Sequence, residues 1–259
     1  MADTVSFGIP GIDTLIGGGL QKGSSYLLEV EPGTEELAFI GAYLDEGLRQ
    51  GEVCALVTLD MPHELMIDKL SSLGVDIREG LDLGSMILVD LWGEGKYDPE
   101  HKGSILMTEN VGDPNSVLRI YYDLAAIREG KLKSGRFHGS RIVVCSLSSE
   151  IMTYKFEPTY KLAKLGLNIV REGKTASLQV MTPRMFDETT VAAFEHLNDG
   201  ILVLSMKEVK GRFQRFVRVK QSPIFGFYTD EVPYDIVGNR PYLLTSSSEK
   251  FLSQKRLEP

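Results

Sequence analysis

Residues 26–37 have the sequence Tyr-Leu-Leu-Glu-Val-Glu-Pro-Gly-Thr-Glu-Glu-Leu, and they decide the fold class. The apolar run at 26–30 predicts a buried strand, and the amphipathic pattern at 35–50 predicts a helix after it. A strand, a Gly-containing turn and a helix are the layout of a phosphate-binding loop, G-x-x-x-x-G-K-[ST]. In such a loop, backbone N–H groups surround the phosphates, the lysine neutralises charge and the hydroxyl ligates Mg²⁺.

The positions of this loop that handle phosphate carry other residues. The centre, Pro32-Gly33-Thr34, is intact, but Val30, Glu35, Glu36 and Leu37 stand at the positions of the two glycines, the lysine and the hydroxyl. Two unit charges about 5 Å apart at an effective dielectric constant near 20 interact by roughly 3 kcal/mol. A glutamate in place of the lysine should therefore repel phosphate. We expect Thr34 to cap the helix, while Glu35 and Glu36 complement its dipole.

Taken alone, this stretch also fits an ordinary strand–turn–helix unit that never bound a nucleotide. The rest of the chain alternates in the same way. Strands are predicted at 26–30, 53–59, 86–91, 141–147 and 177–181, and helices at 35–50, 63–73, 115–129, 158–170 and 187–196. Continuous apolar strands alternating with helices indicate an α/β fold whose mainly parallel, twisted sheet has helices on both faces.

The end of the chain has a different pattern. Short strands at 201–207, 212–220 and 225–229 predict antiparallel C-terminal strands. Residues 93–112 are polar and Gly-rich, which predicts a long surface loop. We expect a single domain over residues 1–245, followed by a polar, mobile tail at 246–259.

Composition restricts the classes of function. The formal net charge of −8 argues against general attraction to nucleic acid or anionic lipid. No apolar run approaches the roughly 20 residues that span a bilayer, and no secretory pattern opens the chain. Cys54 and Cys145 lie in apolar runs and are interpreted as small core residues in a reducing compartment. We expect a cytoplasmic protein without membrane contact.

The sequence around the loop resembles a known family. Residues 7–24 have the pattern F-G-I-P-G-I-D, then G-G-G-L and G-S, and residues 195–200 are E-H-L-N-D-G. Both segments are similar to those of the RecA-like ATPase domain of the KaiC family. The resemblance covers residues 6–230, and it implies a RecA-like P-loop fold.

The resemblance also places the family's catalytic groups. The metal-supporting aspartate corresponds to Cys145, and the pair of acids that activate water corresponds to Asp60-Met61. The K-x-R element corresponds to Lys220 and Ser222, so only its lysine is kept. Phosphoryl transfer requires positioning together with charge stabilisation. We therefore expect a pseudo-ATPase with no catalytic residue and no metal, acting as a binding, regulatory or assembly scaffold.

Alternatives stay open for ligands and partners. No cofactor is expected, although weak binding of ATP or ADP without turnover is the alternative function. The resemblance implies a homo-oligomer, or a hetero-assembly with an active RecA-like relative. A basic strand carrying Arg212, Arg215, Arg218 and Lys220 is interpreted either as a solvated face with salt bridges or as a contact for the acidic helix at 35–46 of another copy.

The remaining titratable groups give weaker predictions. The four histidines lack the spacing of metal ligands, and the basic residues at 131–141, which end in Arg141, are interpreted mainly as a solvated face. Asp90 closes the strand at 86–91 and is a candidate replacement for the lost metal aspartate. An exposed acid at a strand end is the commoner case.

Overall fold

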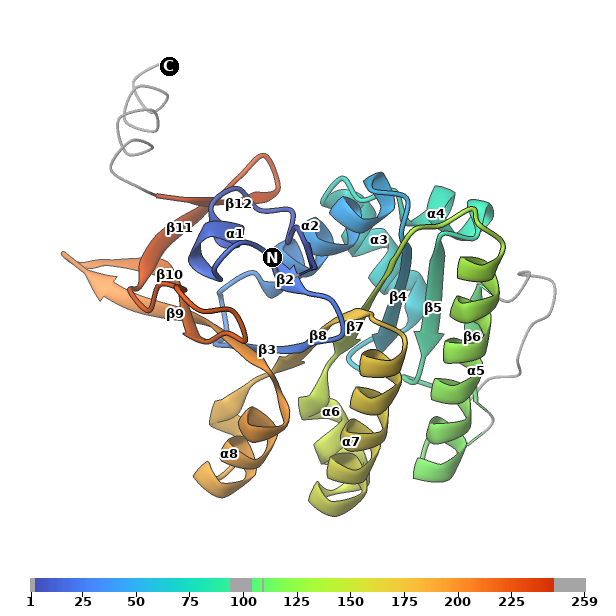
Figure 1. Cartoon of the computed structure of the whole chain (residues 1–259). Helices are drawn as coiled ribbons and strands as arrows, with labels where there is room; N and C mark the ends of the chain where they lie inside the picture. The colour runs from blue at the N-terminus through green and yellow to red at the C-terminus, as the bar shows by residue number, and fades with distance from the viewer. Residues whose placement is uncertain (1–2, 94–103, 109, 245–259) are drawn as a thin grey trace.

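The computed structural model describes residues 3–93, 104–108 and 110–244, which form an α/β fold around one ten-stranded sheet (Figure 1). In chain order the strands of this sheet are β3 (Ser25–Val30), β4 (Val53–Thr58), β5 (Met86–Asp90), β6 (Ile105–Met107), β7 (Ser140–Cys145), β8 (Ala176–Met181), β9 (Gly200–Val209), β10 (Arg212–Gln221), β11 (Val232–Val237) and β12 (Arg240–Leu243). Their spatial order is β12-β11-β10-β9-β3-β8-β7-β4-β5-β6. A separate two-stranded sheet joins β1 (Thr4–Val5) to β2 (Leu20–Gln21).

The sheet is parallel from β9 to β6 and antiparallel from β9 to β12, as expected. Helices cover both faces (Figure 1). One face carries α1 (Ile12–Leu15), α2 (Glu36–Arg49), α3 (His63–Ser72) and α4 (Ile77–Leu83); the other carries α5 (Pro114–Lys133), α6 (Leu147–Tyr154), α7 (Phe156–Glu172) and α8 (Glu188–Leu197). A short 3-10 turn, η2 (Pro183–Met185), follows β8.

Successive side chains of each strand point to opposite faces of the sheet, so the core has one part on each face. Leu28 and Leu56 face α2 and its neighbours, whereas Leu27 and Val57 face the helices on the other side. Both sets are fully buried because the central strands are covered on each face. Burial on both faces explains why the central strands are continuous apolar runs in the sequence.

Some expected boundaries were wrong. Strand β7 ends at Cys145 because the side chain of Ser146 accepts a hydrogen bond from the Ser149 N–H and begins α6, a helix that the sequence did not predict. Residues 225–229 form no strand, since Phe225 is fully exposed and Gly226 has a φ of 84°. The next strand along the chain is β11, at Val232–Val237, which pairs with β10.

The expected loop at residues 93–112 was wrong in part. Strand β6 lies inside it and extends the sheet beside β5. Residues 94–103 and 109 of this loop, and the tail at 246–259, lie outside the described residues. Among the helices that are described, none is long and apolar enough to cross a membrane.

Candidate functional site

The carboxyl ends of the parallel strands gather most of the predicted site residues. The loop at residues 31–35 follows β3, Asp60 follows β4, and Cys145 is the last residue of β7. Ligands of open α/β sheets bind outside this edge. The sequence therefore placed the candidate site at the edge where such a fold can form one.

In the loop after β3, the Thr34 side chain forms a hydrogen bond with the backbone of the loop itself. Val30 is buried at the end of the strand, Gly33 has a φ of 88°, and Thr34 is fully buried. The Thr34 hydroxyl donates to the carbonyl oxygen of Glu31 at 2.7 Å. The expectation that Thr34 caps the helix was wrong, because its hydroxyl donates to Glu31 and the N-cap residue is Glu35.

Helix α2 begins one residue later than that expectation requires. Its N-cap is Glu35, which has left-handed backbone angles (φ 60°, ψ 48°) and makes no side-chain cap hydrogen bond. Glu36 is the first helical residue, and Leu37 packs against the core. Two carboxylates thus stand at the positive end of the helix dipole, as the sequence predicted.

Arginine side chains neutralise the acids of this loop. Arg215 of β10 donates from Nε to the Gly33 carbonyl at 2.9 Å, and its Nη2 lies 3.4 Å from Glu35 Oε1. Arg184 lies 2.8 Å from Glu31 Oε1, and the other oxygen of Glu31 accepts from the Met206 N–H at 2.9 Å. For Arg215, the contact between the basic strand and the acidic loop is made within one chain.

Asp60 is held by the residues that follow β7. One carboxylate oxygen accepts from the hydroxyls of Ser146, at 2.9 Å, and Ser149. The other oxygen lies 3.4 Å from the Cys145 thiol. Burial, and then the charge of Asp60, raises the pKa of Cys145 well above its usual value. A protonated thiol is a poor metal ligand, because metals bind the thiolate.

Lys220 lies on the face of the sheet that carries α8. Its ammonium is 2.5 Å from Glu195 of α8 and 4.0 Å from Glu29 of β3. Burial and the neighbouring Glu195 carboxyl raise the pKa of Glu29 to about 7. Ser222, which the sequence comparison predicts at the position of the family's arginine, donates to the Ile16 carbonyl at 2.9 Å.

One cluster at this edge was missed by the sequence interpretation. Asp90 is buried and not exposed: it accepts from the His63 backbone N–H at 2.9 Å and lies 2.6 Å from His63 Nδ1. Side-chain ligand atoms of His63, Glu64 and Asp90 lie within 4.8 Å of one another, although the histidines have no metal-ligand spacing in sequence. Because Asp90 accepts at the first turn of α3, its contacts are those of a helix cap.

The E-H-L-N-D-G segment holds the strand before the loop, and the Gly-rich entrance holds the N-terminal segment. Asp13 accepts from the Phe7 N–H at 2.7 Å and from the Ser6 hydroxyl at 2.6 Å. Asn198 and Asp199 accept from the hydroxyl and N–H of Ser25, at 2.6 and 2.9 Å. Asn198 and Asp199 therefore position the first residue of β3, whereas Asp13 fastens the N-terminal segment to α1.

The buried Arg141 corrects the interpretation of the basic cluster as a solvated face. This fully buried side chain forms an ion pair with Glu52 and donates to the Ser6 carbonyl at 2.7 Å. Gly47 of α2 leaves room for it, because a Cβ there would stand 2.6 Å from Arg141 Nε. The pair fastens α2 and the N-terminal segment to the sheet.

Comparisons with known proteins agree with this arrangement. The family model described as "ATPase: KaiC" matches residues 5–240. A UPF0273 protein of Aeropyrum pernix is 32% identical over 226 residues, which are 83% of each chain. A solved KaiC-like protein of Pyrococcus horikoshii aligns with a TM-score of 0.71 and 22% identity, covering 95% of this chain and 100% of its own.

A second solved structure from Pyrococcus horikoshii is an uncharacterised protein in complex with an unknown peptide. It aligns with a TM-score of 0.75 and 17% identity, over 93% of this chain and 99% of its own. At such identities the structural matches establish the RecA-like fold, whereas the family model and the Aeropyrum relative establish membership. The chain belongs to the KaiC family of ATPases, together with the UPF0273 proteins.

Proposed function

We propose that this chain does not hydrolyse ATP and acts as a binding, regulatory or assembly scaffold within the KaiC family. The observation that carries the proposal is the loop after β3. Glu36 stands at the lysine position, and the Gly33 carbonyl and the Glu35 carboxylate both contact Arg215. A nucleotide phosphate placed at this loop would have to displace Glu35 from Arg215, with the Glu36 carboxylate at the lysine position.

The groups that would perform the reaction support the same proposal. Asp60 accepts hydrogen bonds from two serine hydroxyls, and Cys145 stands where the family's metal aspartate is expected. The Lys220 ammonium is paired with Glu195. Without a loop lysine and a metal carboxylate, the described residues of this edge offer the transition-state charge of phosphoryl transfer only arginines that are already paired with Glu31 and Glu35.

A scaffold must bind a partner protein, although it catalyses no reaction. One structural neighbour of this fold was solved with a peptide, so a RecA-like framework of this shape can present a peptide-binding surface. We propose that the partner of this chain is another copy or an active RecA-like relative. Mass determination of the purified protein in solution tests whether the partner is another copy. A pull-down with a tagged active relative tests the hetero-assembly.

Phosphate release tests the proposed absence of hydrolysis. Purified protein with ATP and Mg²⁺ should release phosphate at the rate of a heat-denatured control. Asp60→Asn and Lys220→Ala serve as comparison variants. Hydrolysis above background that either substitution abolishes would contradict the proposal, because it would show that these positions still act catalytically.

A second candidate is nucleotide binding without turnover. Arg215 favours it, because its guanidinium lies 3.4 Å from Glu35 and could exchange that carboxylate for a phosphate. Thermal-shift titration with ATP and ADP, with and without Mg²⁺, separates the candidates. A saturable shift that Arg215→Ala removes supports the nucleotide sensor, and the lack of any shift supports the scaffold.

A further inference from the structure

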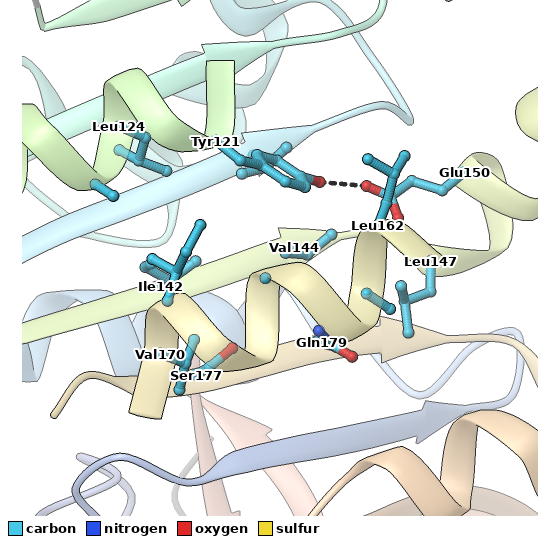
Figure 2. Close-up of a pocket in the computed structure, with 15 residues that line it drawn as sticks. Tyr121, Leu124, Ile142, Val144, Leu147, Glu150, Leu162, Val170, Ser177 and Gln179 are labelled. Atoms are coloured by element: carbon cyan, nitrogen blue, oxygen red, sulfur yellow. Dashed lines mark hydrogen bonds between the residues drawn. The ribbon is translucent and has the colours of Figure 1, made fainter. Parts of the chain in front are cut away.

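A cavity lies between α5 and α7, against strands β4, β7 and β8 (Figure 2). Its volume is about 50 Å³. Most of its lining is apolar, and the residues that the argument uses are Leu124, Ile142, Leu162 and Gly166, with the polar Tyr121 and Glu150. This cavity is on the face opposite α2, so it is not part of the phosphate-loop edge.

The cavity contains a buried carboxyl group, that of Glu150, which has no basic partner in the part of the chain that the structure describes. Glu150 is 1% exposed, and the Tyr121 hydroxyl donates to its Oε1, as Figure 2 shows. Of the described residues, none forms an ion pair with Glu150 or donates a hydrogen bond to its second oxygen. Burial raises the pKa of this carboxyl to about 7. A buried carboxylate that lacks a countercharge is unfavourable, so the site favours a cation.

Gly166 keeps the cavity open. It lies in the interior of α7, where glycine is about 1 kcal/mol less favourable than alanine. A Cβ built at this position meets no atom within 4 Å, whereas one at Gly41 of α2 would lie 3.1 Å from Val75. Close packing therefore requires glycine in α2, but it does not explain the glycine in α7. The missing side chain leaves space beside the half-buried Ala125 and Ile169.

We propose that this cavity binds a short-chain primary aliphatic amine. The ammonium group pairs with Glu150, and the alkyl chain lies among Leu124, Ile142 and Leu162. A cavity of about 50 Å³ holds roughly three or four water molecules, which sets the size of the ligand at a few carbon atoms. The ammonium supplies the missing countercharge, and the apolar lining accepts the chain.

The probe is n-butylammonium chloride at pH 8, with n-butanol as the neutral analogue and sodium chloride as the ionic control. At this pH the carboxyl group is mostly ionised and the amine is still protonated. Thermal shift and calorimetric titration on the whole chain should show saturable binding of the amine, with butanol binding at least tenfold more weakly. Equal affinity for butanol, or no saturable binding of the amine, would overturn the proposal.

Three variants locate the binding. Glu150→Gln removes the charge and Gly166→Leu fills the cavity, so each should weaken amine binding at least tenfold. Gly130→Leu is the matched control, because Gly130 lies in α5 with no neighbour near its Cβ and is not among the cavity-lining residues. If Glu150→Gln does not fold, the comparison of Gly166→Leu with Gly130→Leu still shows whether the amine binds in this cavity. Unchanged binding in Gly166→Leu would overturn the assignment to this cavity.

Discussion

The phosphate-loop edge and the α5–α7 cavity differ in how their polar groups are satisfied. At the loop, the charges of Glu31 and Glu35 are paired with Arg184 and Arg215 of the same chain. In the cavity, the buried Glu150 has a tyrosine hydroxyl as its hydrogen-bond donor and no basic partner among the described residues. The site that the family inherits is internally neutralised, whereas the cavity lacks a charge that a ligand can supply.

The comparison teaches that position in the fold and capacity to bind are separate properties. The loop after β3 has the right place in a RecA-like sheet, but its acids Glu31 and Glu35 are already paired with arginines of the same chain. The cavity has no motif in sequence, yet its carboxyl has no countercharge among the described residues, and we propose that a ligand supplies it. Four substitutions test this difference, beginning with the largest expected effect.

Glu36→Lys should restore attraction for phosphate at the loop. Exchanging repulsion for attraction across about 5 Å, and allowing for solvent screening, changes the binding free energy by roughly 3 kcal/mol, or about a hundredfold in Kd. Calorimetric titration with ADP measures the gain. Glu172→Lys, an equal change of charge on the exposed end of α7, should leave Kd unchanged. An equal gain in that control would mean that only net charge matters.

Glu150→Gln should remove a pH dependence of stability. The pKa of this carboxyl is raised from 4.5 to about 7, so its stabilising contribution is full below pH 4.5 and is lost as the pH rises through 7. The loss is roughly 3 kcal/mol. Urea unfolding at pH 5 and pH 8 should show a smaller difference in the variant than in the parent. An equal difference in both would show that Glu150 titrates normally.

Arg215→Ala should lower the free energy of unfolding, because it removes contacts that hold the loop after β3. It removes the hydrogen bond to the Gly33 carbonyl and the contact with Glu35. The cost in unfolding free energy should be about 1 kcal/mol, because the side chain is partly exposed. Arg212→Ala, an exposed position on the same strand, should change stability by less than about 0.5 kcal/mol. Equal costs for the two variants would contradict a specific role for Arg215.

Gly166→Ala should stabilise the chain slightly. Alanine at a helix-interior position gains about 1 kcal/mol over glycine, and the new methyl group meets no atom within 4 Å. Gly130→Ala on α5 should gain a similar amount, and urea unfolding compares the two. Destabilisation by Gly166→Ala alone would mean that the space beside α7 is not open.

The sequence predicted most of the central fold because the signals there are local. Apolar runs gave the strands at 26–30, 53–59 and 177–181 within a residue, and amphipathic spacing gave α2 and α3. Helix α6 was missed because it begins directly after a strand with no intervening polar segment. Its start depends on the Ser146 cap, which only the end of β7 makes recognisable.

For the candidate site too, the sequence predicted the local features and the structure alone showed the distant contacts. The sequence alone determined that Glu35 and Glu36 stand between the loop and its helix, because residue identity at fixed spacing requires no distant contact. From that spacing we predicted that they replace the chemistry of a phosphate-binding loop. Only the tertiary structure decided that Arg215 lies beside Glu35, that Asp90 lies beside His63 and that Arg141 is buried on Glu52. Those pairs join residues far apart in the chain, and the Glu150 cavity likewise exists only where α5 and α7 meet the sheet, so strand order and helix packing create them.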